Sequence, residues 1–213
     1  MATKLIIVRH GETAWNRGTI YRGTHDVPLN DNGRRQAQLT AAALQKQAID
    51  AAYTSPLSRA SETAQIVLEP HGIIATDEDD LLDFNYGEWT GKEEAEVRRI
   101  WPAEYSEWST RPHEARPPGG TTLEEIYNRC FPMMVSAAKQ HDGGTVALFS
   151  HRVVNKLLVL GALGLGLERF PFIVQGNCAI NTVLFREGEF TIESLNGTAH
   201  LIEGGVEVLE ADF

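Results

Sequence analysis

Leu5-Ile6-Ile7-Val8-Arg9-His10-Gly11-Glu12-Thr13 is the stretch that decides the fold of this chain. Its first four residues are apolar and mostly β-branched, which predicts a buried strand. The hydrophobic signal stops at Arg9-His10-Gly11, so a cation, an imidazole and a glycine stand where a parallel strand would end. Ligands of open α/β sheets bind outside the carboxyl ends of the strands. Two interpretations of His10 follow: an ordinary loop histidine, or a nucleophile with Arg9 holding an anion beside it.

Length and composition place the chain among globular proteins. Its 213 residues are enough for one large α/β domain or two small ones. With 42% hydrophobic and 23% charged residues, the disordered and collagen-like classes are disfavoured. A net charge of −10 argues against nucleic acid or an anionic membrane as the main partner, because both favour a basic face. An anionic substrate would therefore need a local cluster of arginines.

The cysteines and the apolar segments bear on the cellular compartment. Cys130 and Cys178 do not indicate a disulfide framework in a chain of this size, so we expect free thiols in a reducing compartment. Residues 1–4 lead into the first strand without the apolar region of a signal peptide. The apolar stretch 153–167 is shorter than the ~20 residues of a membrane span. The sequence predicts a cytoplasmic protein without a membrane partner.

Strands alternate with helices along the chain, which predicts a parallel sheet covered on both faces. The predicted strands are 5–8, 51–55, 73–75, 145–149, 179–185 and 190–195. The predicted helices are 34–48, 57–69, 92–107, 123–141 and 153–163. Thr122 and Glu125 fit a capping box for the helix 123–141, in which Pro132 predicts a kink or a break. The last dozen residues have the composition of a loose tail.

We expect one domain over residues 1–213, with residues 73–122 as an insertion between core elements. Segments of this kind often form lids or specificity walls. The insertion places aromatic residues beside Asp83 and Glu88. An aromatic setting removes water from a carboxyl group, which raises its pKa and suits it to act as an acid near neutral pH.

Four candidate residues follow strand ends and should meet at one edge of the sheet: Arg9, His10, Arg59 and His151. Arg59 also stands in the first turn of a helix, where the dipole favours an anion; the alternative is a surface ion pair. Guanidinium groups match the oxygens of a transferring phosphoryl group. One imidazole can attack phosphorus, the second can donate to an oxygen, and a carboxylic acid can protonate the leaving alkoxide. The patterns of metalloproteases, P-loop proteins and dinucleotide-binding proteins are absent from the sequence.

A series of motifs between about residues 5 and 200 occurs in the order of a known family. They are Val8-Arg9-His10-Gly11-Glu12-Thr13-Ala14-Trp15-Asn16, Gly23-Thr24-His25-Asp26-Val27-Pro28-Leu29, Gly33-Arg34-Arg35-Gln36-Ala37, Ser55-Pro56-Leu57-Ser58-Arg59-Ala60-Ser61-Glu62-Thr63-Ala64, Gly87-Glu88-Trp89-Thr90-Gly91, Pro118-Gly119-Gly120 and Ser150-His151. In these motifs the chain resembles the histidine phosphatase superfamily, the phosphoglycerate mutase-like enzymes. It is most similar to the broad-specificity phosphatase subgroup.

The resemblance implies a three-layer α/β/α sandwich with a mostly parallel sheet. It implies a phosphohistidine intermediate on His10. It also implies that Arg9, Arg59 and His151 bind the phosphoryl group, with Asn16 as a further contact. No metal and no cofactor are expected.

Other candidate binding residues leave alternatives open. Arg22 and Gly23 lie in a loop that is either solvated or one wall of an anion pocket. Asp83 stands where the family usually has a glutamate as proton donor, so either Asp83 serves as the acid or Glu88 shares the role. Arg152 stands where the family commonly has glycine after the second histidine. It either adds a cation to the phosphate pocket or points into solvent.

Three functions are compatible with these residues. The first is metal-independent hydrolysis of small phosphomonoesters through His10, with a small phosphorylated metabolite as substrate. The second is a bisphosphate-primed phosphoglycerate mutase, for which the chain is short. The third is a catalytically weak domain that binds a phosphorylated ligand, an alternative that Asp83 leaves open. A homodimer is among the oligomeric states that the sequence allows.

Overall fold

The opening stretch forms β1 (Thr3–Arg9), which lies inside the sheet. In the computed structural model, which describes residues 1–207, the sheet has six strands in the order β3-β2-β4-β1-β5-β6. β1 is parallel to β4 (Thr145–Ser150), with Arg9 opposite Ser150. The residues that follow these two strands therefore leave the sheet side by side.

The remaining strands complete a mostly parallel sheet. β2 (Ala51–Thr54) is parallel both to β4 and to the short β3 (Thr76–Asp77). On the other side, β5 (Ile180–Arg186) is antiparallel to β1 and forms a hairpin with β6 (Glu189–Gly197). The predicted α/β class with a mostly parallel sheet is confirmed.

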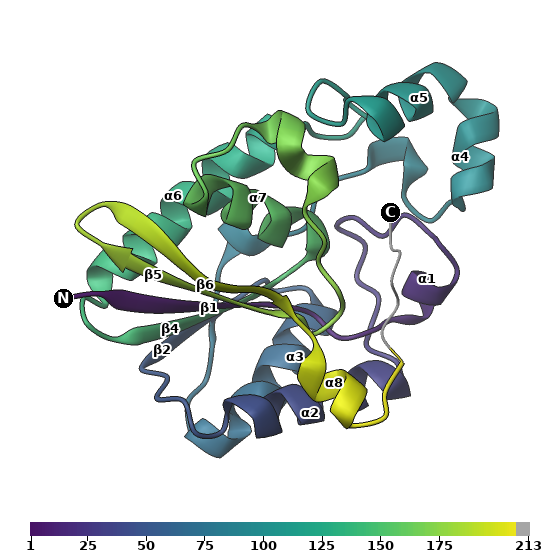
Figure 1. The fold of residues 1–213 in the computed structure, drawn as a ribbon. Helices are drawn as coiled ribbons and strands as arrows, with labels where there is room; N and C mark the ends of the chain where they lie inside the picture. The colour runs from purple at the N-terminus through teal and green to yellow at the C-terminus, as the bar shows by residue number, and fades with distance from the viewer. Residues whose placement is uncertain (208–213) are drawn as a thin grey trace.

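Helices cover both faces of the sheet (Figure 1). One face carries α6 (Leu123–Gln140) and α7 (Arg152–Ala162). The other carries α2 (Asp31–Leu44), α3 (Ser58–Leu68) and α8 (Ala199–Glu203). Successive side chains of a strand point to opposite faces, so the apolar run of β1 is buried on both. Leu5 and Ile7 belong to the core under α6 and α7, and Ile6 and Val8 to the core over α2 and α3.

Short elements complete the described chain. They are the helices α1 (Ala14–Arg17), α4 (Glu94–Ile100) and α5 (Pro102–Thr110), and the 3-10 turns η1 (Glu69–His71), η2 (Asp79–Leu81), η3 (Gly87–Trp89) and η4 (Leu167–Phe172). Figure 1 shows α4 and α5 beyond the carboxyl end of the sheet, on the side of α7. This position brings them over the strand ends that carry the candidate residues.

The predicted single helix 92–107 is wrong: the segment forms α4 and α5. Pro102 is the first residue of α5 and lacks the N–H that would continue α4. A proline also disfavours the helical conformation in the residue before it. Trp101 accordingly has φ −124° and ψ 62° between the two helices.

Other predicted elements also differ from the structure. The predicted strand 73–75 is wrong, because the chain pairs with Tyr53 only from Thr76 onward, and Ile74 is 94% exposed. α2 begins earlier than predicted, since the Asn30 side chain accepts a hydrogen bond from the Gly33 amide at 2.7 Å. α6 runs to Gln140 without a break at Pro132. In the predicted loose tail, residues 202–203 end α8, and residues 208–213 lie outside the described part of the chain.

Candidate active site

Two histidines meet where β1 and β4 end. His10 follows β1, and its backbone amide donates to the Ser150 carbonyl at 2.9 Å. His151 follows β4 and is the N-terminal cap residue of α7. The centres of the two imidazole rings are 5.3 Å apart. Parallel pairing of two strands therefore brings together residues that are far apart in the sequence.

The position of the His10 ring determines which nitrogen is free to react. Its Nδ1 lies 2.6 Å from the Gly11 carbonyl oxygen, which can only accept a hydrogen bond. The proton of the neutral ring therefore lies on Nδ1, and Nε2 carries the lone pair. The residue is 1% exposed. Burial, followed by the charges of Arg59, Arg9 and Arg22, lowers the pKa of His10 well below its usual value.

Two buried arginines lie near strand ends beside this ring: Arg9 is the last residue of β1, and Arg59 follows β2. Arg59, in the first turn of α3, is 0% exposed. Its guanidinium donates to the carbonyl oxygens of Gly23 at 2.7 Å and His25 at 2.9 Å. Arg9 donates to the Gln175 carbonyl at 2.7 Å. These carbonyl oxygens hold both guanidinium groups in fixed directions without neutralising their charge.

His151 is held by a hydroxyl group. Its Nε2 lies 2.8 Å from Ser55 Oγ, the first residue after β2. Its Nδ1 lies 3.7 Å from Asp83 Oδ2. Burial lowers the pKa of His151 well below its usual value, and the charge of Arg59 acts in the same direction.

Asp83 is the carboxylate that the structure brings to the histidines. It is 7% exposed, and its Oδ2 accepts from Arg59 at 3.2 Å while its Oδ1 accepts from the Phe84 amide at 2.9 Å. Burial lowers the pKa of Arg59, while the neighbouring Asp83 charge opposes that effect. Glu88 is exposed on η3. Of the two predicted proton donors, the geometry therefore favours Asp83.

A pocket opens between these groups. It is lined by His10, Ile20, Tyr21, Arg22, Gly23, Asp83, Tyr86, Arg152 and Val153. Arg22 and Gly23 therefore form a wall of the pocket, as one of the two interpretations has it. Arg152 is buried and lines the pocket, so the alternative in which it points into solvent is wrong.

Asn16 lies in α1, six residues after His10. It is buried, and its Oδ1 accepts hydrogen bonds from the Thr13 amide at 2.8 Å and the Thr13 hydroxyl at 2.9 Å. It is not among the residues that line the pocket. These contacts fix the loop after His10, and the role of Asn16 as a phosphoryl contact stays a prediction.

Glu12 is a buried residue of the motif with a positioning role. Its carboxylate accepts hydrogen bonds from Arg17 at 2.7 Å, Asn30 at 2.8 Å and Asn32 at 3.0 Å. These bonds attach the loop after His10 to the beginning of α2. Glu12 is not among the predicted site residues, although a carboxylate beside a predicted strand end, followed by a loop rich in asparagine, was a usable signal.

Three further residues support the site and are not among the predicted site residues: Ser55, Thr63 and Gln175. Ser55 contacts His151, and Gln175 holds Arg9. Thr63 Oγ1 accepts from the Gly11 amide at 3.0 Å. Ser55 is the last residue of a predicted strand, so its position could have been recognised. The other two act across long sequence separations that no local pattern reveals.

Neither a metal-ligand cluster nor a membrane-spanning helix occurs in residues 1–207. Within this range, no group of three or more His, Cys, Asp or Glu side chains is placed to hold a metal ion. No helix of the described residues is long and apolar enough to cross a membrane.

Together these groups are suited to bind a phosphoryl dianion. The guanidinium groups of Arg9, Arg22 and Arg59 supply positive charge, and the neutral His10 ring supplies an unprotonated nitrogen. Asp83 supplies a carboxyl group beside them. Fixed cations in a water-poor site stabilise the charge of a phosphoryl transition state.

Comparisons with known proteins agree with this chemistry. The phosphoserine phosphatase 1 of Hydrogenobacter thermophilus is 33% identical over 98% of this chain and 99% of its own length. A 2,3-bisphosphoglycerate-dependent phosphoglycerate mutase of Mesorhizobium japonicum is 30% identical over 77% of this chain and 83% of its own length. The solved structure of YhfR from Bacillus stearothermophilus superimposes with a TM-score of 0.90 at 28% identity, over 93% of this chain and 99% of that one.

The family model of the histidine phosphatase superfamily (branch 1) matches residues 5–198, which include every residue placed in the pocket. The match, the relatives and the geometry around His10 lead to one conclusion. The chain belongs to the histidine phosphatase superfamily.

Proposed function

We propose that this protein is a metal-independent phosphatase that hydrolyses small phosphomonoesters through a phosphohistidine on His10. The observation that carries the proposal is the buried Nε2 of His10, which keeps its lone pair because Nδ1 is committed to the Gly11 carbonyl. A nitrogen nucleophile beside Arg9, Arg22 and Arg59 can approach a phosphoryl group that is already bound by cations.

The reaction has two steps. In the first, His10 Nε2 forms a bond to phosphorus, the bond from phosphorus to the ester oxygen breaks, and the departing oxygen takes the proton of the Asp83 carboxyl group. In the second, the Asp83 carboxylate removes a proton from water, whose oxygen attacks phosphorus as the P–N bond breaks. Phosphate leaves, and both His10 and Asp83 return to their starting states.

His151 and Arg59 act on the phosphoryl oxygens in both steps. Each lies within reach of Asp83 Oδ2, at 3.7 Å and 3.2 Å, so the proton donor and the oxygen-binding groups form one cluster. In the transition state, negative charge spreads over the phosphoryl oxygens. The site thereby binds the transition state more strongly than the ground state.

The proposal extends to the substrate and the compartment. A phosphorylated metabolite such as phosphoserine, which the name of one relative includes, is a candidate. We propose that residues 73–122 form the wall that selects among such substrates. The buried free thiols of Cys130 and Cys178 favour a reducing compartment such as the cytoplasm.

Hydrolysis of p-nitrophenyl phosphate in excess chelator tests the proposal, with wild type compared with His10→Asn. The asparagine amide can keep the hydrogen bond to Gly11 but cannot attack phosphorus. We expect activity that survives chelation in the wild type and falls by at least ~10³-fold in the variant. Equal activity in both proteins would contradict the role of His10.

A second candidate function is favoured by the similarity to a phosphoglycerate mutase. A mutase shares the first step but must return the phosphoryl group to an alcohol rather than to water. Incubation with 3-phosphoglycerate and the bisphosphate primer separates the two functions. We expect release of free phosphate; an isomerised product without free phosphate would establish the mutase.

A further inference from the structure

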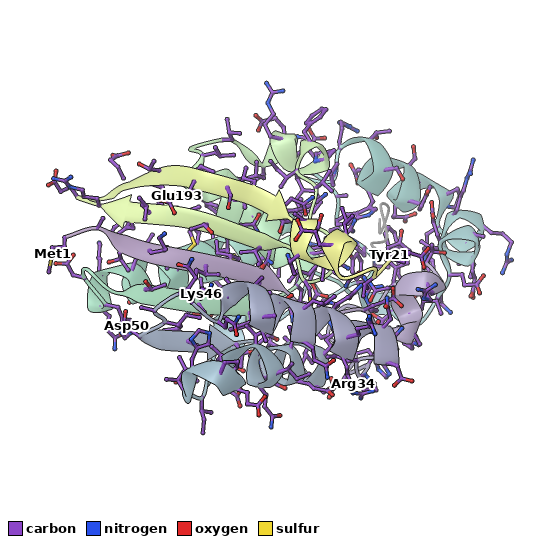
Figure 2. The ribbon with its side chains drawn as sticks, turned by 60° about the horizontal axis from the view of Figure 1, so that its bottom comes forward. Met1, Tyr21, Arg34, Lys46, Asp50 and Glu193 are labelled. Atoms are coloured by element: carbon purple, nitrogen blue, oxygen red, sulfur yellow. The ribbon has the colours of Figure 1, made fainter. Side chains whose placement is uncertain are left out.

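A second cavity adjoins the phosphate pocket. Its volume is ≈ 270 Å³, and it shares Tyr21 and Arg152 with the pocket beside His10. Tyr21, labelled in Figure 2, lies between the carboxyl end of the sheet and helices α4 and α5. A substrate whose phosphoryl group lies at His10 can therefore extend its leaving group into this cavity.

Aromatic side chains form part of the wall of the second cavity. Tyr105 and Trp108 come from α5, and Phe170 comes from η4. The rings of Trp108 and Phe170 lie 6.3 Å apart between centres. Such walls bind apolar groups by removing their surface from water. The volume lies just below the ~300–1,000 Å³ typical of sites for drug-sized ligands, so it suits a group of about one ring.

The same cavity carries two cationic side chains from α7. Arg152 and Lys156 are four residues apart, so they lie one turn apart on the same side of the helix. Lys156 is only 7% exposed. Its Nζ donates to the Phe170 carbonyl at 3.3 Å and lies 4.4 Å from the centre of the Phe170 ring. A charged group is thus held at the border of an apolar cavity.

Arg152 is the first residue of α7, and Lys156 follows one turn later. α7 has 11 residues and no acidic residue in its first turn, which faces the two pockets through Arg152. Cations near a helix N-terminus oppose its dipole, and an anion there is stabilised. The carboxylate of Glu94 also lines the cavity, but it accepts a hydrogen bond from the Tyr105 hydroxyl. The α7 side of the cavity is therefore suited to a negative group.

We propose that this cavity binds a leaving group with a carboxylate on an apolar body of about one ring, and that Lys156 selects the charge. The substrate class is then the phosphomonoesters of apolar hydroxy acids. The proposal rests on the proposed function, because a leaving group presupposes transfer of the phosphoryl group to His10.

The test compares 4-carboxyphenyl phosphate with 4-carbamoylphenyl phosphate, which has a similar shape without the charge. We expect the ratio of the two kcat/KM values, acid over amide, to fall about ten-fold in Lys156→Met, because one charge-assisted contact is lost. Lys156→Arg should retain most of the ratio. The matched control is Lys46→Met, an exposed position far from Tyr21 in Figure 2, where no change is expected. Comparing ratios between variants cancels the different reactivities of the two esters.

An unchanged ratio in a folded Lys156→Met protein would overturn the proposal. If that variant does not fold, inhibition of the wild type by benzoate and by benzamide decides instead. We expect benzoate to compete with p-nitrophenyl phosphate at the lower concentration, and equal inhibition by the two would also overturn the proposal. If no ester is hydrolysed in a His10-dependent reaction, the proposed function itself is contradicted. Failure of the proposed function is therefore distinguishable from failure of the proposed carboxylate selectivity.

Discussion

The imidazole of His10 is directed by its neighbours on both sides. The Gly11 carbonyl fixes the proton on Nδ1, and burial among arginines keeps the ring neutral. His151 has a lowered pKa for similar reasons, but its Nε2 contacts Ser55 rather than a carbonyl. His10 is therefore suited to attack phosphorus, and His151 is suited to bind a phosphoryl oxygen.

Arg59 provides a prediction at the level of a single side chain. Arg59→Ala should lower kcat/KM for p-nitrophenyl phosphate by ~10²–10³-fold, as loss of one preorganised transition-state contact does in other enzymes. The control is Arg34→Ala, a half-buried residue labelled in Figure 2 that pairs with Glu62 at 2.6 Å. Steady-state kinetics of both variants measure the effect, and an undiminished rate in Arg59→Ala would remove this residue from the site.

Asp83 supports a prediction that separates the two chemical steps. Asp83→Asn should release about one equivalent of p-nitrophenol per site rapidly, because this leaving group needs little help from an acid. Turnover should then fall by ~10²–10⁴-fold, because water lacks its general base. Stopped-flow absorbance measures the burst and the slow phase. Glu88→Gln is the matched control, and a burst in that variant rather than in Asp83→Asn would reverse the assignment.

At the level of elements, the loop after β1 is packed against the beginning of α2 at two glycines. A Cβ on Gly33 would lie 2.1 Å from the Glu12 carbonyl oxygen, and a Cβ on Gly11 would lie 2.5 Å from the Gly33 carbonyl oxygen. Backbone atoms cannot move aside as the end of a side chain can. This close approach, together with the hydrogen bonds of Glu12, sets the position of His10 relative to α2.

Gly33→Ala should therefore lower the free energy of unfolding by roughly 1–3 kcal/mol, the usual effect of overpacking, and lower kcat as the loop moves. Gly18→Ala is the control, because its Cβ would meet only the end of the Ile20 side chain, at 3.2 Å. Urea unfolding of both variants measures the difference. Equal stabilities would show that the loop and α2 can separate without loss of packing.

At the level of the whole molecule, the two buried histidines link stability to pH. Both have a folded pKa below the unfolded value of 6.5. Above pH 6.5 both are neutral in either state, so they add no pH dependence. Below pH 6.5 the unfolded chain binds protons that the folded chain does not. As the pH decreases in this range, the free energy of unfolding falls by about 1.4 kcal/mol per pH unit for each histidine.

His10→Asn should remove one of these two contributions. The slope of unfolding free energy against pH, measured by urea denaturation between pH 6.5 and 5, should then decrease by up to about 1.4 kcal/mol per pH unit. The carboxyl groups contribute to both proteins alike and cancel in the comparison. A slope identical to that of the wild type would mean that His10 takes up its proton while the protein is folded.

The sequence by itself determined the central strand, the residues that follow it and, to within one residue, the starts of α3, α6 and α7. These features are local: an apolar β-branched run forms β1, and Thr122 with Glu125 forms the predicted capping box of α6. Parallel strands share one carboxyl edge, so Arg9, His10 and His151 could be expected to meet. The motifs around these residues are also local in the sequence, so they predicted the family.

The tertiary structure alone decided what depends on distant partners. Asp83 rather than Glu88 faces the histidines, because Asp83 is buried against Arg59 and His151 while Glu88 lies exposed on η3. Arg152 lines the pocket because it begins α7 directly after His151. The second cavity needs α5, η4 and α7 together. Side-chain direction and packing across long separations fix these features, and no pattern of neighbouring residues carries that information.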